Sequence, residues 1–346
     1  MMPHFGKRHL ERHVTMLSSA DTQVFKTVCP VIVITGIFGN IMNFVIICRL
    51  WKQFQAFSYY FLAQTVTDLC LLTLVMLPRW AESLAQLRLE FPVEGQWLCK
   101  IDAWILYTAT CVSAWVRTAM AFQRMVVVVW PQKARSKLAF LRKMTKMVLL
   151  FIVAINIALQ ANILFGEVLI LSNCYLGSTK FLDMDTLGGL VQTWLNFAFT
   201  CVVPFIVIFI SNTTLLITLL QSNRVCAASG STTNSTSDNG IFRLSKTYTL
   251  TVTIMGTALA YCLLLTPVYL LEALVVSGVV PGDQISANTW SVLVLMIITN
   301  AAVSFFIYVV SGYRFRQEAK NLMEVFRKLL FPRRSQVVPL IKDSPH

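Results

Sequence analysis

The sequence predicts an all-α membrane protein, a seven-transmembrane helix bundle with a short amphipathic helix after the seventh. Of its 346 residues, 56% are hydrophobic and only 13% are charged, and the mean hydropathy is +0.66. A soluble core could not bury this much apolar surface. Seven apolar runs are long enough to cross a hydrocarbon core of roughly 30 Å, for which about 20 helical residues suffice.

The seven runs cover residues 27–49, 57–79, 101–128, 147–166, 187–221, 247–272 and 288–311. Outer-membrane strands are a poor alternative, because each crossing of a barrel has about ten residues of alternating polarity. No short apolar stretch with a small-residue cleavage site precedes residue 27, so the first helix is expected to act as its own insertion signal. The predicted organisation is an extracellular tail over 1–26, the bundle over 27–312, the amphipathic helix over 313–330 and a cytoplasmic tail over 331–346.

Basic residues in the loops predict the orientation. The loops after runs one, three and five, together with the C-terminus, carry 19 Lys and Arg residues, against 8 on the other side. Basic loops stay in the cytoplasm, which places the N-terminus outside a plasma membrane. Anionic lipid explains the net charge of +13 better than nucleic acid, which we exclude as a partner. A glycan on the acceptor sequence at Asn234 would invert this topology.

Runs two and three carry ionisable side chains at membrane depth. Asp68 lies midway along run two, where a charge costs roughly 2.5 to 3.5 kcal/mol and needs a partner or a watery cavity. Ser113, Arg117 and Arg124 are four and seven residues apart on run three. Those spacings place them on one polar stripe of a helix, which should face the bundle interior.

The other runs add polar residues and prolines. Asn40 in run one and Asn300 in run seven could each donate to a carboxylate, or could simply join one helix to another. Pro204 and Pro267 fall inside runs five and six, where each removes a backbone hydrogen bond and should bend the helix.

Cysteines and histidines give little sign of chemistry. Cys99 and Cys174 lie on the predicted outer side, where an oxidising compartment permits a bridge between them, and the other seven cysteines are interpreted as small apolar residues. All four histidines are near the termini, so the bundle is expected to hold no metal or cofactor. No phosphate loop, nucleophile elbow or carboxylate pair indicates an enzyme.

Over about residues 27–325 the chain resembles the rhodopsin-like class of G-protein-coupled receptors, and in particular its peptide receptors. The resemblance rests on Asn40, Asp68, the "WLC" that ends at Cys99, Arg124 placed 25 residues later, Cys174, Pro204, Pro267 and Tyr308. It implies that a heterotrimeric G protein binds near Gln123, Arg124, Met125 and Tyr308 once helix six swings outward.

Several positions depart from the family pattern. Gln123 and Met125 replace an Asp and a Tyr, Leu265 replaces a Trp, and the Asn-Pro of helix seven reads Ser304 and Phe305. Helix four lacks its usual Trp, and Thr247 stands where some members have an acid. The resting state is therefore expected to lack ion pairs that restrain the G-protein-binding Arg, which would raise basal signalling.

The resemblance also implies a polar core. Asp68, Ser113, Asn300 and Ser304 are similar to the family's sodium pocket, and Arg117 lies one helical turn below Ser113. We hypothesise that Arg117 partners Asp68 as a tethered cation in place of sodium, because buried opposite charges cost far less together than apart.

The predicted outer end is the expected ligand site. Leu106 replaces the Asp of amine receptors, and helix seven has no Lys for retinal. By family position the site is lined by Arg79, Trp80, Tyr107, Trp194, Tyr269, Glu272 and Trp290. Aromatic surface with one cation and one anion suits a peptide, for example a neuropeptide of the FMRFamide type. The alternative for each aromatic is the interfacial belt, where Trp and Tyr collect without a ligand.

Two cytoplasmic segments complete the expectation. In the amphipathic helix Tyr313, Phe315, Leu322 and Phe326 should lie against lipid headgroups. Phosphorylation of the Ser- and Thr-rich stretch 231–237 by a receptor kinase could recruit arrestin, and a plain linker is the equal alternative.

Two other functions stay open on sequence alone. Asp68 and Arg117 could form the relay of a transporter or pump, although no inverted repeat is evident. The departures from the family pattern also fit a weakly coupling or scaffold receptor.

Overall fold

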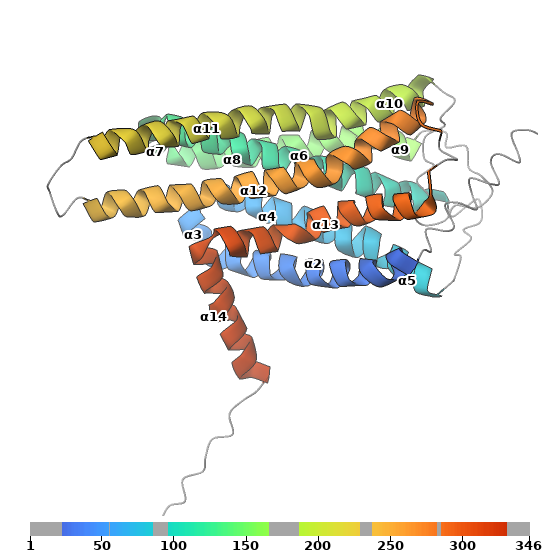
Figure 1. Ribbon diagram of the computed structural model, residues 1–346, viewed down its shortest axis with the longest axis horizontal. Coiled ribbons are helices and arrows are strands. Elements are labelled where there is room, and N and C mark those ends of the chain that lie inside the picture. Colours follow the sequence, from blue (N-terminus) through green and yellow to red (C-terminus); the bar gives the residue numbers. More distant parts are fainter. Residues whose placement is uncertain are drawn as a thin grey trace, which may run out of the picture.

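The computed structural model describes residues 23–54, 56–85, 96–165, 187–228, 237–281 and 285–330. Long helices lie side by side along one axis (Figure 1), which confirms the predicted all-α bundle. Among the described residues, seven helices are long and apolar enough to cross a membrane. These spans are Gln23–Arg49, Phe57–Ala81, Lys100–Val129, Ala139–Leu164, Leu190–Gln221, Thr251–Val276 and Asn288–Ser311.

Several spans consist of more than one helical segment. In chain order the segments are α2 (Gln23–Arg49), α3 (Trp51–Phe54), α4 (Phe57–Cys70), the π-helix η1 (Leu71–Met76), α5 (Leu77–Ala85), α6 (Gln96–Val129), α7 (Pro131–Ser136), α8 (Leu138–Leu159), α9 (Ala161–Phe165), α10 (Leu187–Phe197), the π-helix η3 (Ala198–Val202), α11 (Val203–Ala228), α12 (Ser237–Val276), α13 (Ala287–Ser311) and α14 (Tyr313–Leu330).

Some helices extend beyond the apolar runs that predicted them. Helix α8 begins at Leu138 rather than at 147, with Arg142, Lys143 and Lys146 exposed on its first turns. Helix α2 begins at Gln23, ahead of residue 27, and Phe25 in this extra turn packs into the core. Hydropathy detects the part of a helix that lies in lipid, so polar turns at either end escape it.

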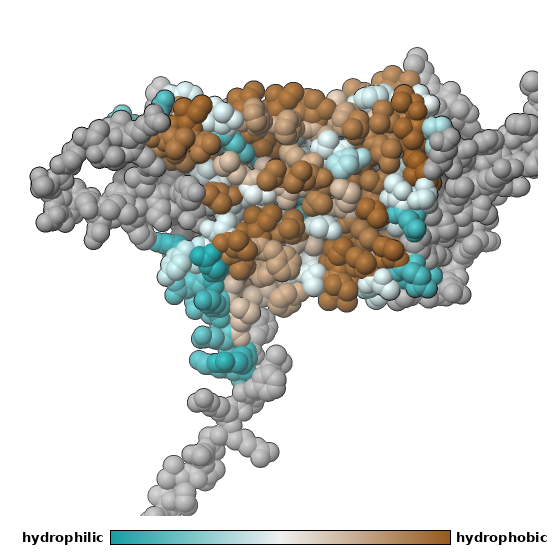
Figure 2. Space-filling model, viewed as in Figure 1, coloured by the Kyte–Doolittle hydropathy of each residue, from teal (hydrophilic) through white to brown (hydrophobic). Residues whose placement is uncertain are grey.

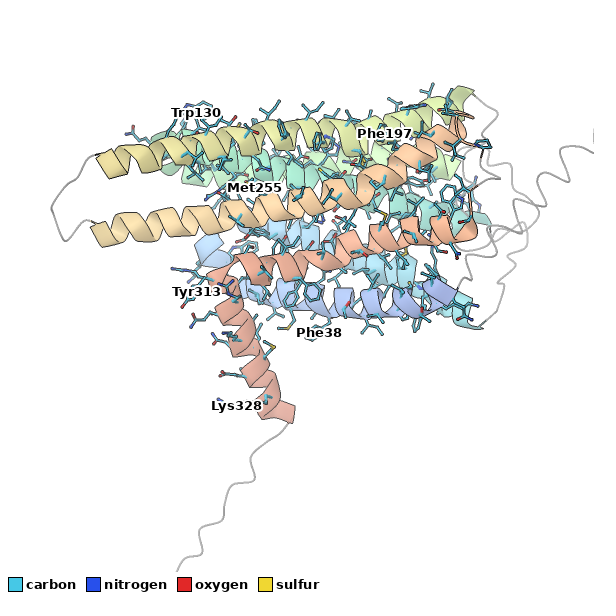
Figure 3. All side chains as sticks on the ribbon, viewed as in Figure 1. Phe38, Trp130, Phe197, Met255, Tyr313 and Lys328 are labelled. Atoms are coloured by element: carbon cyan, nitrogen blue, oxygen red, sulfur yellow. The ribbon has the colours of Figure 1, made fainter. Side chains whose placement is uncertain are left out.

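The outer flanks of the bundle are apolar. Phe38 points outward from α2 with 57% of its surface exposed (Figure 3), and Phe151 and Val310 on other helices are more exposed still. Apolar side chains cover much of the visible flank, whereas α14 is hydrophilic (Figure 2). Exposed apolar flanks of this kind are matched to lipid rather than to water.

Two π-helical segments each end two residues before a proline. Pro78 and Pro204 are each the second residue of the helix that follows η1 and η3. A proline has no N–H for the carbonyl four residues earlier and its ring clashes with it, and a local π turn relieves both problems. Pro267 lies inside α12, which bends toward its C-terminal end in Figure 1.

Helices α2 and α13 approach each other closely through small residues. A methyl group added at Gly36 would lie 2.8 Å from Ala302 Cβ, and one at Gly39 would lie 2.9 Å from Phe305 Cβ. Asn40 Nδ2 donates across this contact to the carbonyl of Ala301 at 3.0 Å. Small residues and an interhelical amide hydrogen bond are typical of packing between membrane helices.

Helix α14 turns away from the bundle at the end of α13 (Figure 1). Phe315, Ala319 and Leu322 are buried against the bundle, so Phe315 and Leu322 contact protein rather than the lipid headgroups predicted for them. Arg316 Nη1 donates to the carbonyl of Val310 at 2.5 Å, where a helix end leaves carbonyls unpaired. We call this end of the bundle the α14 end and the other the opposite end.

Candidate functional site

A polar cluster lies in the middle of the bundle. Asp68, on α4, is 1% exposed, and its carboxylate lies inside the bundle. It accepts hydrogen bonds from Gln64 Nε2 at 2.8 Å and from Ser304 Oγ of α13 at 3.3 Å. Gln64 Nε2 also donates to Ser113 Oγ of α6 at 2.7 Å. The cluster therefore joins three helices around one buried carboxylate.

The guanidinium of Arg117 enters this cluster from α6. Arg117 Nη1 donates to Ser113 Oγ at 2.5 Å, and the side chain is 2% exposed. Among the described residues no ion pair joins Arg117 directly to Asp68. The two charged side chains are connected through hydrogen bonds of Ser113 and Gln64. The residues of the predicted polar core therefore lie together, with Ser113 and Gln64 between the guanidinium and the carboxylate. The role of Arg117 as the cation that partners Asp68 stays a prediction.

Tyr261 of α12 connects the cluster to a further helix. Its ring lies below the guanidinium of Arg117, with 5.3 Å from the guanidinium carbon to the ring centroid. Its hydroxyl donates to the carbonyl of Thr200 in η3. That carbonyl is four residues before Pro204, which has no N–H to offer it, so Tyr261 supplies the missing donor. A continuous chain of contacts thus runs through η3, α12, α6, α4 and α13.

The two asparagines do not reach the carboxylate. Asn40 donates to the backbone of α13, as the helix-joining alternative predicts. Asn300 is buried, and its Oδ1 has no hydrogen-bond partner within the described part of the chain. The sequence alone could not decide whether each asparagine donates to the carboxylate or joins two helices. Both arrangements place the amide in the bundle interior, and they differ only in how the helix is rotated about its axis.

The residues predicted to bind a G protein gather at the α14 end. Gln123 Oε1 accepts a hydrogen bond from Thr145 Oγ1 of α8 at 3.1 Å. Arg124 is 7% exposed, with its guanidinium carbon 5.8 Å from the ring centroid of Phe57, and Met125 is half-buried beside it. Tyr308 is buried between the rings of Phe61 and Phe315, whose centroids lie 5.2 and 5.5 Å from its own.

At the opposite end, α6 and α12 are joined by two hydrogen bonds and one ring contact. The hydroxyl of Tyr107 donates to Glu272 Oε1. Thr110 Oγ1 and the hydroxyl of Tyr269 are 2.6 Å apart in a second hydrogen bond. The rings of Tyr107 and Tyr269 meet edge to face, with centroids 6.4 Å apart. Three predicted ligand-binding residues therefore form one connected group.

The other predicted ligand-binding residues are arranged less tightly. Arg79 of α5 forms a buried ion pair with Asp102 of α6. Trp80 and Trp290 are half-buried against the same apolar core as Tyr107 and Tyr269. Trp194 of α10 is 40% exposed and donates to Ser277 Oγ at 2.9 Å, which fits the interfacial belt better than a ligand site.

Some predicted features lie outside the described residues. They are Cys174, the Ser- and Thr-rich stretch up to its last residue, Ser237, where α12 begins, and the side chains of Cys99, Thr247 and Phe326. In the part of the chain that the structure does describe, no group of three or more His, Cys, Asp or Glu side chains could hold a metal ion.

Sequence reasoning missed four residues of these clusters. Two of them could have been predicted. Gln64 lies one helical turn before Asp68 and so can reach its carboxylate, and Asp102 is an acid near the start of the third apolar run, where it needs a partner. Tyr261 and Thr110 gave none, because a Tyr or Thr in an apolar run is common and its partner is on a distant helix.

Comparison with known proteins agrees with this arrangement. The sequence model of one protein family, described as 7 transmembrane receptor (rhodopsin family), matches residues 39–308. The type-1 angiotensin II receptor of Meleagris gallopavo is 27% identical over 225 residues, which are 63% of this chain and 58% of that receptor. The cysteinyl leukotriene receptor 1 of Cavia porcellus is 26% identical over 216 residues, 58% of each chain. The matches span less than two thirds of these relatives. Because the family model covers most of the bundle, the chain belongs to the rhodopsin family of seven-transmembrane receptors.

Proposed function

We propose that the chain binds a peptide at the opposite end of the bundle and activates a heterotrimeric G protein at the α14 end. In this proposal the opposite end is extracellular, and α12 swings outward at the α14 end when ligand is bound. Arg124 then reaches the G protein. A receptor kinase and arrestin would act on the same state.

The observation that carries this proposal is the way α12 is held to α6. Tyr107 and Thr110 of α6 bond Glu272 and Tyr269 of α12 at the opposite end. Deeper in the bundle, Arg117 of α6 lies over the ring of Tyr261. A ligand that competes for the first contacts changes the relative energies of two positions of α12, and only such differential binding can shift a conformational equilibrium.

Two further observations support the choice of ligand. The matched relatives are named as receptors for angiotensin II and for cysteinyl leukotrienes, which are peptide and lipid ligands respectively. The opposite end of this chain presents tyrosines and tryptophans beside ionised groups. Peptides offer both aromatic surface and charged groups to such a site.

The test is a peptide-library screen on cells that express the chain, with cytosolic calcium and cyclic nucleotide as readouts. Arg124→Ala should abolish the response while leaving ligand binding and surface expression in place. Arg142→Ala is the matched control, because Arg142 is a basic residue at the same end that is exposed on α8. Binding without a response in the unaltered chain would favour the scaffold alternative, and substrate uptake or proton current would favour a transporter.

A further inference from the structure

We propose that the opposite end selects ligands that carry a positive charge, and that Glu272 of α12 is the residue that binds this charge. The inference rests on the proposed function, since it names the ligand chemistry of the same site. It narrows that site from any peptide to one with an exposed guanidinium or ammonium group.

The one predicted cation of this site is already neutralised within the protein. Arg79 Nε donates to Asp102 Oδ2 at 3.1 Å, and a second guanidinium nitrogen bonds the same oxygen. Both side chains are at least nine-tenths buried. Breaking such a pair to bind a ligand carboxylate would leave Asp102 as an uncompensated buried charge, which is strongly unfavourable. A ligand terminus therefore does not find a free cation at Arg79.

Glu272 is in the opposite situation. The hydrogen bond that it accepts comes from the hydroxyl of Tyr107, a neutral group. The residue is half-buried rather than buried, unlike Arg79 and Asp102. An ionised carboxylate can accept several hydrogen bonds at once, and the one from Tyr107 leaves room for more.

The sum of these charges favours a cation. Arg79 and Asp102 cancel, and Glu272 leaves this group of three residues with one excess negative charge. Asp102 Oδ1 is a further buried acceptor that has no hydrogen-bond partner among the described residues. A partly desolvated site with excess acceptors and excess negative charge attracts donor-rich cations and repels anions.

The surrounding aromatic groups fit the same ligand. Tyr107 and Tyr269 belong to one apolar core cluster, against which Trp80 and Trp290 pack. Aromatic faces attract cations, and Arg most of all, because its planar guanidinium stacks on the ring while its edge bonds a carboxylate. Glu272 on α12 and Tyr107 on α6 would thus be engaged together by one basic side chain.

The experiment uses two libraries of amidated hexapeptides that are identical except that every Arg in one is citrulline in the other. Citrulline keeps the shape of Arg and removes its charge. Binding to the purified full-length protein is read as a rise in the thermal unfolding midpoint, because a ligand of the native state stabilises it. The unaltered protein should prefer the Arg library by about 10- to 100-fold in affinity, the usual range for one charge-assisted hydrogen bond.

Variants of Glu272 supply the controls. Glu272→Gln keeps the size and an acceptor for Tyr107, and it should bind both libraries equally. Glu272→Asp keeps the charge and should retain the preference, and Glu318→Gln removes an acid at the α14 end without effect. The unfolding midpoint of each variant without peptide shows that it is folded.

Equal binding of the two libraries by the unaltered protein, or an Arg preference that survives in Glu272→Gln, would overturn the assignment. Because binding is measured without a signalling partner, this outcome is distinct from failure of the proposed function. Peptides that bind with an Arg preference but evoke no cellular response would contradict G-protein coupling and leave the ligand chemistry in place.

Discussion

Asp68 and Arg117 show how a membrane interior can hold two opposite charges without direct contact. The hydroxyl of Ser113 accepts hydrogen bonds from Arg117 and Gln64, and Gln64 carries a further bond on to Asp68. Each charge therefore has dipoles oriented toward it, and the cluster as a whole is neutral. Such a network is costly when only part of it is satisfied, which makes each member sensitive to substitution.

A double-mutant cycle tests this coupling. Asp68→Asn leaves the positive charge of Arg117 uncompensated and should lower the free energy of unfolding by about 1 to 3 kcal/mol. Arg117→Gln should be harmful in the same way, and the double variant should be more stable than the sum of the single effects predicts. The thermal unfolding midpoint of the detergent-solubilised protein is the measurement. Additive effects would show that the two charges do not interact.

The same pair predicts the response to sodium. If Arg117 supplies the positive charge that Asp68 requires, ligand affinity should be unchanged across sodium concentrations at constant ionic strength. Radioligand or fluorescent-peptide binding measures this, with potassium as the balancing cation. A marked sodium dependence that disappears in Asp68→Asn would contradict the role assigned to Arg117.

Tyr261 has two separable roles. Tyr261→Phe removes the donor to the carbonyl of Thr200 but keeps the ring beneath Arg117, so it should cost about 1 kcal/mol, as interhelical hydrogen bonds in membranes do. Tyr261→Leu also removes the cation–π contact and should cost roughly 0.5 to 2 kcal/mol more. Unfolding midpoints of the two variants measure the difference. Equal midpoints would show that the ring contributes nothing to Arg117.

At the scale of helices, close packing of α2 on α13 depends on Gly36 and Gly39. Gly39→Leu places a branched side chain where Phe305 Cβ already lies 2.9 Å from an added methyl group. The two helices must separate, and the hydrogen bond from Asn40 to Ala301 is then lost. We expect less folded protein at the cell surface, measured by an antibody to an extracellular tag. Overpacking strain should lower the free energy of unfolding by about 1 to 3 kcal/mol, seen as a lower unfolding midpoint.

Phe38→Leu is the matched control for that change. Phe38 is on the same helix one residue earlier, but its side chain points outward from the bundle (Figure 3). A Leu in that place still faces an apolar surrounding, so expression and midpoint should be close to those of the unaltered protein. If the Gly39→Leu protein is as stable as the Phe38→Leu protein, the contact between α2 and α13 accommodates a larger side chain and does not depend on Gly39.

Helix positions were predictable from the sequence, but helix irregularities were only partly so. The long apolar runs predicted all seven spans, because lipid requires about 20 such residues for each crossing. Pro204 and Pro267 predicted disturbed helices. Pro78 carries the same signal, but in run two Asp68 was considered and this proline was overlooked. A proline alone does not specify the π-helical form, because Pro78 and Pro204 follow π-helical segments whereas Pro267 lies inside an α-helix.

For the whole molecule, the sequence predicted which residues face the interior better than which of them touch. Asp68, Ser113, Arg117 and Ser304 were all expected in one polar core, and the structure brings them together. Their order along the relay depends on Gln64, and the ion pair of Arg79 depends on Asp102. Partners of this kind are fixed by the rotation of each helix about its axis, and hydropathy leaves that rotation undetermined.

The orientation in the membrane is the remaining prediction for the whole molecule. The excess of Lys and Arg on the side of α14 should keep that end in the cytoplasm, because short basic loops resist translocation. An epitope tag on the N-terminus should therefore bind antibody in intact cells, and one on the C-terminus only after permeabilisation. Asn234 lies in a loop that is predicted on the same side, so it should carry no glycan. Enzymatic removal of N-glycans should then change the electrophoretic mobility of the Asn234→Gln variant and of the unaltered chain by the same amount. A C-terminal tag stained in intact cells, or a glycan lost in Asn234→Gln, would place α14 outside and exchange the ligand and G-protein ends.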